Sequence, residues 1–390
     1  MIGTSMATSD LVSELTRNAV DVLPAGELER KLALGRPLRV KLGIDVTSPD
    51  IHVGRAIPLQ RMRAFQDRGH LGVLIVGDYT TRVGDPSGRS SERPILSDEE
   101  IDANAQTYVD QAYQIIDPDR TEVRFNGEWL SRLSFADVLR LTRTTTVARL
   151  LERDDFANRY TAGQPISISE LLYPLMQAYD SVAVEADVEL GGTDQLYNLL
   201  AGREVMQAYG LEPQVALTTP LLLSWDGEKM SSSVGNNIPL TAPPEEQFGR
   251  TMRVPDELLP DWYRLVLETE LDPDADPLEA KLELARFIVR RSYGDEAAKA
   301  AEGHFTRVVR EGREPEEVAE AALPPGDPVH LPALIREVFG LSTSEARRLI
   351  AQGAVKLDGS PTTDLDVSRE ALAGALLQVG KRQFARLGGG

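Results

Sequence analysis

The sequence predicts an α/β protein with a parallel sheet in its first half, and three stretches lead to this prediction. Residues 39–45 (RVKLGID) have the length of a strand and end in Gly and Asp. Residues 57–69 have the pattern of a helix and end in glycine, which often follows a helix. Residues 71–78 (LGVLIVGD) are almost continuously apolar, as expected for a parallel strand covered on both faces. Strand, helix and strand in this order form a βαβ unit, so we expect a Rossmann-like sheet.

The second half of the chain changes to helices and then to short mixed elements. Residues 276–294 begin with Asp, then Pro, with Glu three residues after the Asp, which is a signal for a helix start. The Pro-rich residues 322–332 predict a linker. Residues 342–360 predict a capped helix, a glycine stop, a strand and an Asp-Gly turn, and residues 376–387 predict one closing strand. Because 390 residues exceed one ordinary domain, we expect three: a Rossmann-like domain over 1–235, an α-helical domain over 236–325 and a small α+β domain over 326–390.

Composition excludes several classes of protein. The chain has no cysteine, which excludes a disulfide framework and a thiolate metal site. It has no apolar run near eighteen residues and no recognisable secretory signal, so we expect no membrane span and a cytoplasmic location. The net charge of −19 argues against general nucleic-acid binding, but residues 331–390 carry eight Lys/Arg and six Asp/Glu. This mildly basic tail is able to place positive charge where a polyanion docks.

The segment His52–Arg55 (HVGR) follows the first predicted strand and opens a helix. A helix N-terminus presents unpaired N–H groups and partial positive charge, which suits a phosphate. A histidine there is able to donate to a phosphate oxygen, and Gly54 allows a flat ligand such as adenine to lie against the backbone. For this motif alone, a loop histidine and a turn glycine remain the alternative.

The segment Lys229–Ser233 (KMSSS) lies in a stretch rich in Gly and Asn. Its lysine supplies a point charge, and its hydroxyl and amide groups supply hydrogen bonds to a polyphosphate. Alone, it is as well explained by a surface loop. Together with the first motif, at the other end of an α/β domain, it resembles the ATP-binding motifs of class I aminoacyl-tRNA synthetases.

Three further stretches narrow the resemblance. Residues 84–93 (GDPSGRSSER), 171–180 (LLYPLMQAYD) and 191–195 (GGTDQ) are similar to those of bacterial tyrosyl-tRNA synthetases. The resemblance extends from Leu38 to Leu387, and the motifs occur in the family's order.

The resemblance implies a site for tyrosine and a site for ATP. Asp85, Tyr173 and Gln177 would hold the ammonium group of tyrosine, and Asp180 would accept its phenolic O–H. The full tyrosine-binding set is Lys41, Gly43, Asp85, Tyr173, Gln177, Asp180 and Gln195. The ATP-binding set is Asp45, His52, Gly54, Gly192, Asp194, Lys229 and Met230. The residues expected to act on the phosphates are Thr47, His52, Arg55, Arg89, Arg93, Lys229, Ser231 and Ser232.

Three positions depart from the family pattern. Arg55 stands where the first motif usually ends in His or Asn, and Ser232 stands where the loop often has a second lysine. An arginine is larger and permanently charged, so Arg55 either binds phosphate or ribose or points into solvent. Lys41 stands where many bacterial members have a tyrosine that shares the phenol oxygen; it either pairs with Asp180 or points away.

The tail resembles a small RNA-binding domain found in a ribosomal protein and attached to many bacterial tyrosyl enzymes. We expect it to contact tRNA phosphates through one basic patch, with an ordinary amphipathic surface as the alternative. The helical domain would bind the anticodon, by resemblance only. The residues of the patch are Arg347, Arg348, Lys356, Lys381, Arg382 and Arg386.

The resemblance implies a ligase that activates L-tyrosine with ATP and Mg²⁺ and transfers it to tRNA(Tyr), acting as a homodimer. No resident metal is expected. One alternative is a weakened paralogue that serves as an RNA-binding or regulatory protein, with Arg55 and Ser232 as signs of decay. Another is an enzyme that transfers the tyrosyl group to an acceptor other than tRNA.

Overall fold

The computed structural model describes residues 8–87, 96–311, 318–380 and 383–388. The chain divides into two compact units, one of Met1–Pro243 with Arg250–Ser292 and the other of Pro244–Gly249 with Tyr293–Gly390. Each unit has its own hydrophobic core. In the described part of the chain, no helix is long and apolar enough to cross a membrane.

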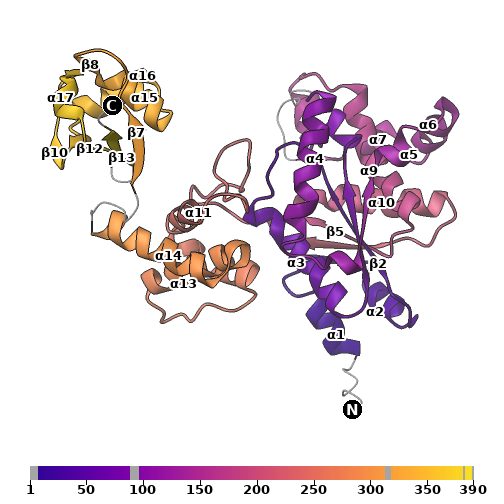
Figure 1. Ribbon diagram of the computed structural model, residues 1–390. Coiled ribbons are helices and arrows are strands. Elements are labelled where there is room, and N and C mark those ends of the chain that lie inside the picture. Colours follow the sequence, from indigo (N-terminus) through magenta and orange to yellow (C-terminus); the bar gives the residue numbers. More distant parts are fainter. Residues whose placement is uncertain (1–7, 88–95, 312–317, 381–382, 389–390) are drawn as a thin grey trace. The chain divides into compact units, whose positions relative to one another are not determined.

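A six-stranded sheet organises the first unit (Figure 1). Its order is β1-β6-β5-β2-β3-β4, and every pairing is parallel except that of β1 with β6. This confirms the α/β prediction. The strands are β1 Asp21–Leu23, β2 Arg39–Ile44, β3 Leu71–Val76, β4 Thr121–Phe125, β5 Val188–Gly192 and β6 Val215–Thr219.

Helices cover both faces of this sheet, with α3 and α4 on one side and α9 and α10 on the other (Figure 1). In β3, Leu74 and Val76 belong to the core that includes α3, whereas Val73 and Ile75 pack with Val184 of α9. This two-sided burial explains the continuous apolar run. The longer helices are α3 Val53–Asp67, α4 Asp98–Ala112, α9 Ile168–Val184, α10 Leu196–Ala208 and α13 Pro277–Tyr293.

Shorter helices complete the first unit. The α-helices are α1 Thr8–Leu15, α2 Glu27–Leu32, α5 Gly127–Leu130, α6 Phe135–Thr142, α7 Val147–Leu150, α8 Asp154–Thr161 and α12 Leu259–Trp262; α11 Pro244–Thr251 lies across the division between the units. The remaining turns of helix are η1 Thr80–Arg82, η2 Pro118–Arg120, η3 Thr193–Gln195, η4 Asp256–Leu258 and η5 Tyr263–Leu267.

The second unit holds a five-stranded sheet in the order β10-β9-β12-β13-β7 and a short pair, β8 with β11. Its strands are β7 Ala319–Ala322, β8 Val329–His330, β9 Val355–Leu357, β10 Ser360–Pro361, β11 Asp366–Val367, β12 Leu376–Val379 and β13 Gln383–Gly388. Its helices are α14 Asp295–Phe305, η6 Thr306–Arg310, α15 Leu331–Phe339, α16 Thr343–Ala351 and α17 Arg369–Leu372.

Two sequence predictions about this unit are wrong. Residues 376–387 form two antiparallel strands, because Gly380 has φ of 63° and allows the chain to turn. The Pro-rich stretch 322–332 is not a linker between units, because Leu323, Val329 and Leu331 are buried in the core of the second unit. The boundaries expected at residues 235 and 325 stay predictions.

Candidate active site

The predicted site residues of the first unit gather where strands β2 and β5 end. From β2, the sheet continues through β3 and β4 in one direction and through β5 and β6 in the opposite direction. The strand order therefore reverses between β2 and β5, which makes this a topological switch point. Ligands of open parallel sheets bind outside the carboxyl ends of strands at such a point. Asp45 follows β2, and Asp194 and Gln195 follow β5.

Helix α3 begins at Val53, within the segment His52–Arg55 that was predicted to open a helix, and the preceding histidine caps it. His52 has extended backbone angles, and its Nδ1 accepts the backbone N–H of Arg55 at 3.3 Å. A Cβ added to Gly54 would lie 3.2 Å from His52 Nδ1 and 3.5 Å from Met230 Cβ. Gly54 therefore brings the two motifs into contact, and a side chain at that position would displace one of them.

Two backbone hydrogen bonds join the first motif to the chain that follows the second. Val53 N–H donates to the Ile238 carbonyl at 3.0 Å, and Leu240 N–H donates to the Ile51 carbonyl at 2.8 Å. Both motifs were predicted to lie at one nucleotide site, and these hydrogen bonds hold the chain segments that carry them together.

The charge of His52 follows from its surroundings. Burial, aided by the positive charges of Arg55 and Lys229, lowers the pKa of His52 well below its usual value. The ring is therefore neutral near pH 7. Because Nδ1 accepts from the helix, the ring proton lies on Nε2, which is free to donate to a ligand oxygen.

The lysine of the second motif lies against the first helical turn after β5. Lys229 Nζ pairs with Asp194 Oδ2 at 2.5 Å. Ser231 Oγ lies 2.9 Å from Ser233 Oγ, and Ser232 Oγ accepts from Asn237 Nδ2 at 3.2 Å. These contacts hold the lysine and the serines of the motif at the predicted nucleotide site.

Arg55 does not point into solvent. Its guanidinium donates to the Tyr108 hydroxyl on α4, and its Cζ lies 6.0 Å from the centroid of the same ring. Arg55 is half-buried. A fixed positive charge thus stands beside His52 where the family pattern has a smaller side chain.

The predicted amino-acid pocket lies between β2 and α9. Tyr173 Oη donates to Asp45 Oδ2 at 2.9 Å, and Thr80 Oγ1 donates to Asp45 Oδ1 at 2.7 Å. Gly43, on β2, is open: a Cβ added there would meet no atom within 4 Å. Thr47 is half-buried in the loop before His52.

Lys41 is fully buried and its ion pair is with Glu189, not with Asp180. Its Nζ lies 2.8 Å from Glu189 Oε1, and it also donates to Ser181 Oγ at 2.7 Å and to the Gln177 carbonyl at 3.0 Å. The direct pair of Lys41 with Asp180, one of the two expected arrangements, is therefore wrong. The reason is that Glu189 lies in the adjacent strand at the opposite position of the β2–β5 register.

Glu189 also holds Gln177, whose Nε2 donates to Glu189 Oε1 at 3.1 Å. The Gln177 Oε1 atom is buried and has no hydrogen-bond partner among the described residues. Because a carboxylate accepts only, Glu189 leaves the amide oxygen of Gln177 as the group available to a cation. Sequence analysis missed Glu189; a charged residue within an otherwise apolar strand was the available signal.

Asp180 lies deep in the same pocket, 3% exposed. Its Oδ1 accepts from Trp129 Nε1 at 2.8 Å and its Oδ2 from Asn126 Nδ2 at 3.2 Å. Burial raises the pKa of Asp180 to about 7, although the charge of Lys41 and the two hydrogen bonds act in the opposite direction. Asn126 and Trp129 were not predicted, and their positions just after β4 gave no distinctive signal.

The remaining predicted tyrosine-site residues contact each other. Gln195 Nε2 donates to Asp85 Oδ2 at 2.7 Å, and the Ser87 backbone N–H donates to Asp85 Oδ1 at 2.9 Å. Gly192 packs closely, since an added Cβ would lie 2.7 Å from Asp194 Oδ1. The predicted phosphate residues Arg89 and Arg93 lie outside the described residues.

The predicted basic residues of the second unit lie on two kinds of element. Arg347 and Arg348 are exposed on α16. Lys356 of β9 and Arg386 of β13 are next to the buried Val355 and Leu387, which belong to the core that contains residues of α16. They therefore point away from that helix. Lys381 and Arg382 lie outside the described residues.

The acidic side chains of the site that the structure describes already have protein partners. Among the described residues, no group of three or more His, Asp or Glu side chains is placed to hold an ion. Asp194 is paired with Lys229, and Asp45 accepts from Tyr173 and Thr80. A divalent cation would therefore depend on ligands that a substrate supplies.

Comparison with known proteins identifies the family of this chain. Residues 33–310 match the family of class I tRNA synthetases (W and Y). The sequence is 46% identical over 398 residues to the tyrosine–tRNA ligase of Thermotoga maritima, covering 99% of each chain. It is 49% identical over 390 residues to the tyrosine–tRNA ligase of Moorella thermoacetica, covering 96% of this chain and 94% of that one.

Among solved structures, the tyrosyl-tRNA synthetase of Archaeoglobus fulgidus complexed with L-tyrosine is similar with a TM-score of 0.62. The likeness covers 76% of this chain and 99% of that one at 24% identity. At this identity it supports the class I fold alone.

Proposed function

The chain belongs to the tyrosine–tRNA ligases of class I, and on that basis we propose how its residues carry out their reaction. The reaction activates L-tyrosine with ATP to tyrosyl-adenylate and pyrophosphate, and then transfers the tyrosyl group to the 3′ end of tRNA(Tyr). The observation that carries this conclusion is 46–49% identity to tyrosine–tRNA ligases over nearly the full chain. No observation favours a weakened paralogue.

Tyrosine binds with its ring beside Gly43. Its ammonium group and its phenolic O–H each meet acceptors of the pocket. Asp85, Tyr173 and Gln177 hold the ammonium group; the unpartnered Oε1 of Gln177 supports this role. Asp180 accepts the phenolic O–H at the bottom of the pocket. Phenylalanine would leave Asp180 without that donor, and a buried polar group without its partner costs more than a lost contact.

ATP binds along the N-terminus of α3. Adenine lies against Gly54 and Met230, and Asp194 binds the ribose with Gly192 and Asp45 close by. In this proposal Lys229 leaves Asp194 when ATP binds, because the triphosphate offers its ammonium group a more strongly charged partner. The release directs the lysine to the phosphates.

Carboxylate and triphosphate repel each other, so catalysis requires positioning and spreading of negative charge. Neutral His52 donates through Nε2, and Arg55, fixed on Tyr108, supplies a permanent charge that offsets the absence of a lysine at Ser232. The remaining phosphate ligands in this proposal are Thr47, Arg89, Arg93, Lys229 and Ser231. The tyrosine carboxylate attacks the α-phosphorus and pyrophosphate leaves.

Magnesium enters as part of the substrate. Mg²⁺ is usually held by one or two carboxylates together with substrate phosphates, which matches a site without a protein cage. It therefore arrives as the Mg²⁺ complex of ATP, where it neutralises phosphate charge.

The part of the chain that follows the catalytic domain contacts tRNA(Tyr). Residues 236–325 form a helical anticodon-binding domain and residues 326–390 a small RNA-binding domain, following the catalytic domain 1–235. Arg347, Arg348, Lys356, Lys381, Arg382 and Arg386 are the proposed phosphate contacts. The reaction takes place in the cytoplasm, where tRNA is charged.

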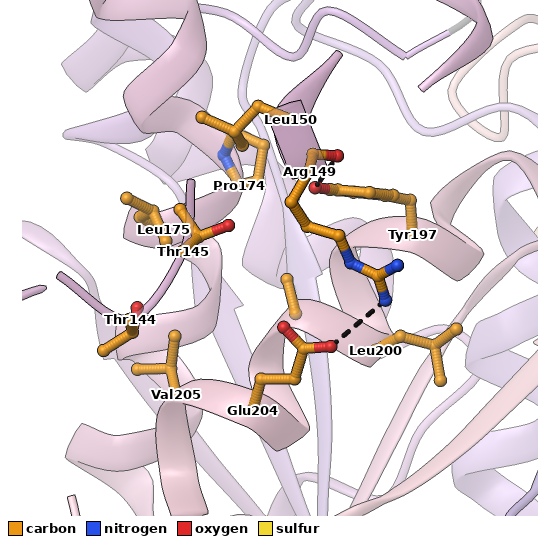
Figure 2. Close-up of a pocket in the computed structure, with 11 residues that line it drawn as sticks. Thr144, Thr145, Arg149, Leu150, Pro174, Leu175, Tyr197, Leu200, Glu204 and Val205 are labelled. Atoms are coloured by element: carbon orange, nitrogen blue, oxygen red, sulfur yellow. Dashed lines mark hydrogen bonds and ion pairs between the residues drawn. The ribbon is translucent and has the colours of Figure 1, made fainter. Parts of the chain in front are cut away.

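The active form is a homodimer, and the segment 135–168 supports this proposal. Five large apolar side chains are exposed in it: Phe135, Leu139, Val147, Tyr160 and Ile168. A pocket is lined in part by residues of the same segment, including Leu150, and carries an ion pair between Arg149 and Glu204 (Figure 2). A second copy would cover the exposed apolar side chains, because burial of apolar surface stabilises association.

Tyrosine-dependent exchange of pyrophosphate into ATP, followed by charging of tRNA(Tyr), tests the function. Exchange with charging is the expected result. Exchange without charging would indicate another acceptor, and the absence of both would indicate a protein that has lost activation.

A further inference from the structure

A buried arginine lies behind the amino-acid site and belongs to none of the sets assigned above. The side chain of Arg153 is 4% exposed and pairs with Asp155, Nη2 to Oδ2 at 2.9 Å. Its Cζ lies 5.0 Å from the ring centroid of Phe156 and 5.2 Å from that of Tyr197. The guanidinium is thus held by an ion pair and two rings.

Arg153 determines which way the neighbouring amide points. A guanidinium has donors only, so each neighbour must present an acceptor to it. Nη1 donates to Asn198 Oδ1 at 2.7 Å, and Nη2 donates to Ser87 Oγ at 3.0 Å. The oxygen of Asn198 therefore faces Arg153, and its amide nitrogen faces Gln195 and Ser87.

The orientation of Asn198 in turn fixes the orientation of Gln195, and Gln195 contacts Asp85. Asn198 Nδ2 donates to Gln195 Oε1 at 3.0 Å, so the oxygen of Gln195 faces away from the pocket. Gln195 Nε2 then donates to Asp85 Oδ2 at 2.7 Å. One N–H of this amide is used on Asp85, and the other is available to the carboxylate of a bound amino acid.

We propose that Arg153 is a positioning residue for tyrosine, which orients Asn198 and through it Gln195, so that the Gln195 amide nitrogen faces Asp85 and the substrate. This inference rests on the proposed function, in which Asp85 and Gln195 bind tyrosine. With Gln195 reversed, its oxygen would stand 2.7 Å from an Asp85 oxygen, and two acceptors would oppose each other.

The Asn198→Asp variant tests the direction of the amide chain at almost unchanged shape. One oxygen of the new carboxylate keeps the contact with Arg153, and the other faces Gln195 Oε1, where a donor is now missing. The expected loss of tyrosine affinity is about 10- to 100-fold, the range for a buried polar group without its partner. The KM for ATP is expected to stay within about twofold, because the ATP site contains none of these groups.

Arg153→Lys and Arg153→Met separate orientation from simple packing. Lysine also has donors only, so Arg153→Lys is expected to retain most of the tyrosine affinity. Arg153→Met has no donor, and its loss of tyrosine affinity is expected to be similar to that of Asn198→Asp. Arg63→Met is the control, since Arg63 is an exposed arginine paired with Asp67 on α3. Calorimetry measures tyrosine binding, and pyrophosphate exchange measures both KM values.

Two outcomes would overturn the proposal: wild-type tyrosine affinity in Asn198→Asp, or equal losses in the lysine and methionine variants. Should Arg153→Met not fold, the aspartate variant still decides. Absence of pyrophosphate exchange in the unmodified protein would contradict the proposed function instead, and calorimetric binding of tyrosine would still decide the role of Arg153.

Discussion

At the scale of single residues, burial sets the charges that the reaction uses. His52 is 5% exposed and its pKa lies well below the usual value, whereas burial raises the pKa of Asp180 to about 7. One group is thereby kept as a neutral donor and the other titrates near neutral pH. Each has a partner that orients it, the α3 backbone for His52 and Trp129 with Asn126 for Asp180.

Replacing His52 or Lys229 by alanine tests their proposed role in binding the phosphates of ATP. Loss of one preorganised donor at a reacting centre typically slows the chemical step by about 100- to 1000-fold. Rapid-quench kinetics of adenylate formation is expected to show this loss, with tyrosine affinity within about twofold of the unmodified protein. Lys299→Ala, an exposed lysine of α14, is the control. Wild-type rates in both variants would remove these residues from the phosphate site.

Asp180 controls both the preference for tyrosine and its pH dependence. Asp180→Asn keeps the shape of the side chain but removes the ionised acceptor, so the ratio of kcat/KM for tyrosine over phenylalanine is expected to fall. Because burial raises the pKa to about 7, the ionised form is present above that pH and lost below it. In the unmodified protein, kcat/KM for tyrosine should therefore rise as pH increases through about 7.

The Asn variant should lack this rise. A variant that keeps both the tyrosine preference and the pH inflection would show that another residue binds the phenol.

Most residues of the site could be predicted from the sequence, but the side chains that they contact could not. Asp45, Asp85, Tyr173 and Gln195 were predicted and lie together. The pairing of Lys41 was not predictable, because the choice between Asp180 and Glu189 depends on the register of β2 against β5. Such a register is a tertiary property with no local signature.

At the scale of elements, strands buried on both faces were the easiest to predict. The residues of β3 are almost all apolar and buried, and this pattern was sufficient to predict a strand covered on both faces. The start of α3 in the segment His52–Arg55 was predicted, but the capping role of His52 was not, because histidine is an uncommon cap. The serine cap of α16 at Ser342 was predictable. The hairpin of β12 and β13 was missed because a single glycine, Gly380, was the turn signal between two stretches that both have the pattern of a strand.

Helices α6 and α9 each present a large apolar residue that a homodimer would cover. Phe135 is 77% exposed and Ile168 is 78% exposed. Replacing both by glutamate is expected to weaken self-association, because charged groups would have to be buried at the interface. Sedimentation equilibrium measures the change, and Val20→Glu, at an exposed apolar residue before β1, is the control. Unchanged association would place the interface elsewhere.

At the scale of the whole molecule, charge is divided along the chain. Residues 331–390 carry a net charge of +2, whereas the whole chain carries −19. Composition alone therefore predicted an acidic body with a mildly basic tail, which is able to place positive charge where a polyanion docks. The way the units are divided was not predictable, because residues 244–249 join a unit whose other residues begin about fifty positions later, at Tyr293.

Reversing two charges on α16 tests the role of the second unit. Arg347→Glu combined with Arg348→Glu is expected to raise the KM for tRNA and to reduce the salt dependence of binding, because fewer phosphates are neutralised. Pyrophosphate exchange should stay unchanged, since activation does not involve tRNA. Glu337→Arg on α15 is a control that changes charge in the opposite direction. Undiminished charging at sub-saturating tRNA would exclude α16 from the contact.

The most direct test of the account is pyrophosphate exchange measured with tyrosine and with phenylalanine in the unmodified protein and in Asp180→Asn. The account predicts exchange that depends on tyrosine, a strong preference over phenylalanine, and a marked loss of that preference in the variant. Exchange that does not depend on tyrosine, or a preference that survives the replacement unchanged, would contradict it.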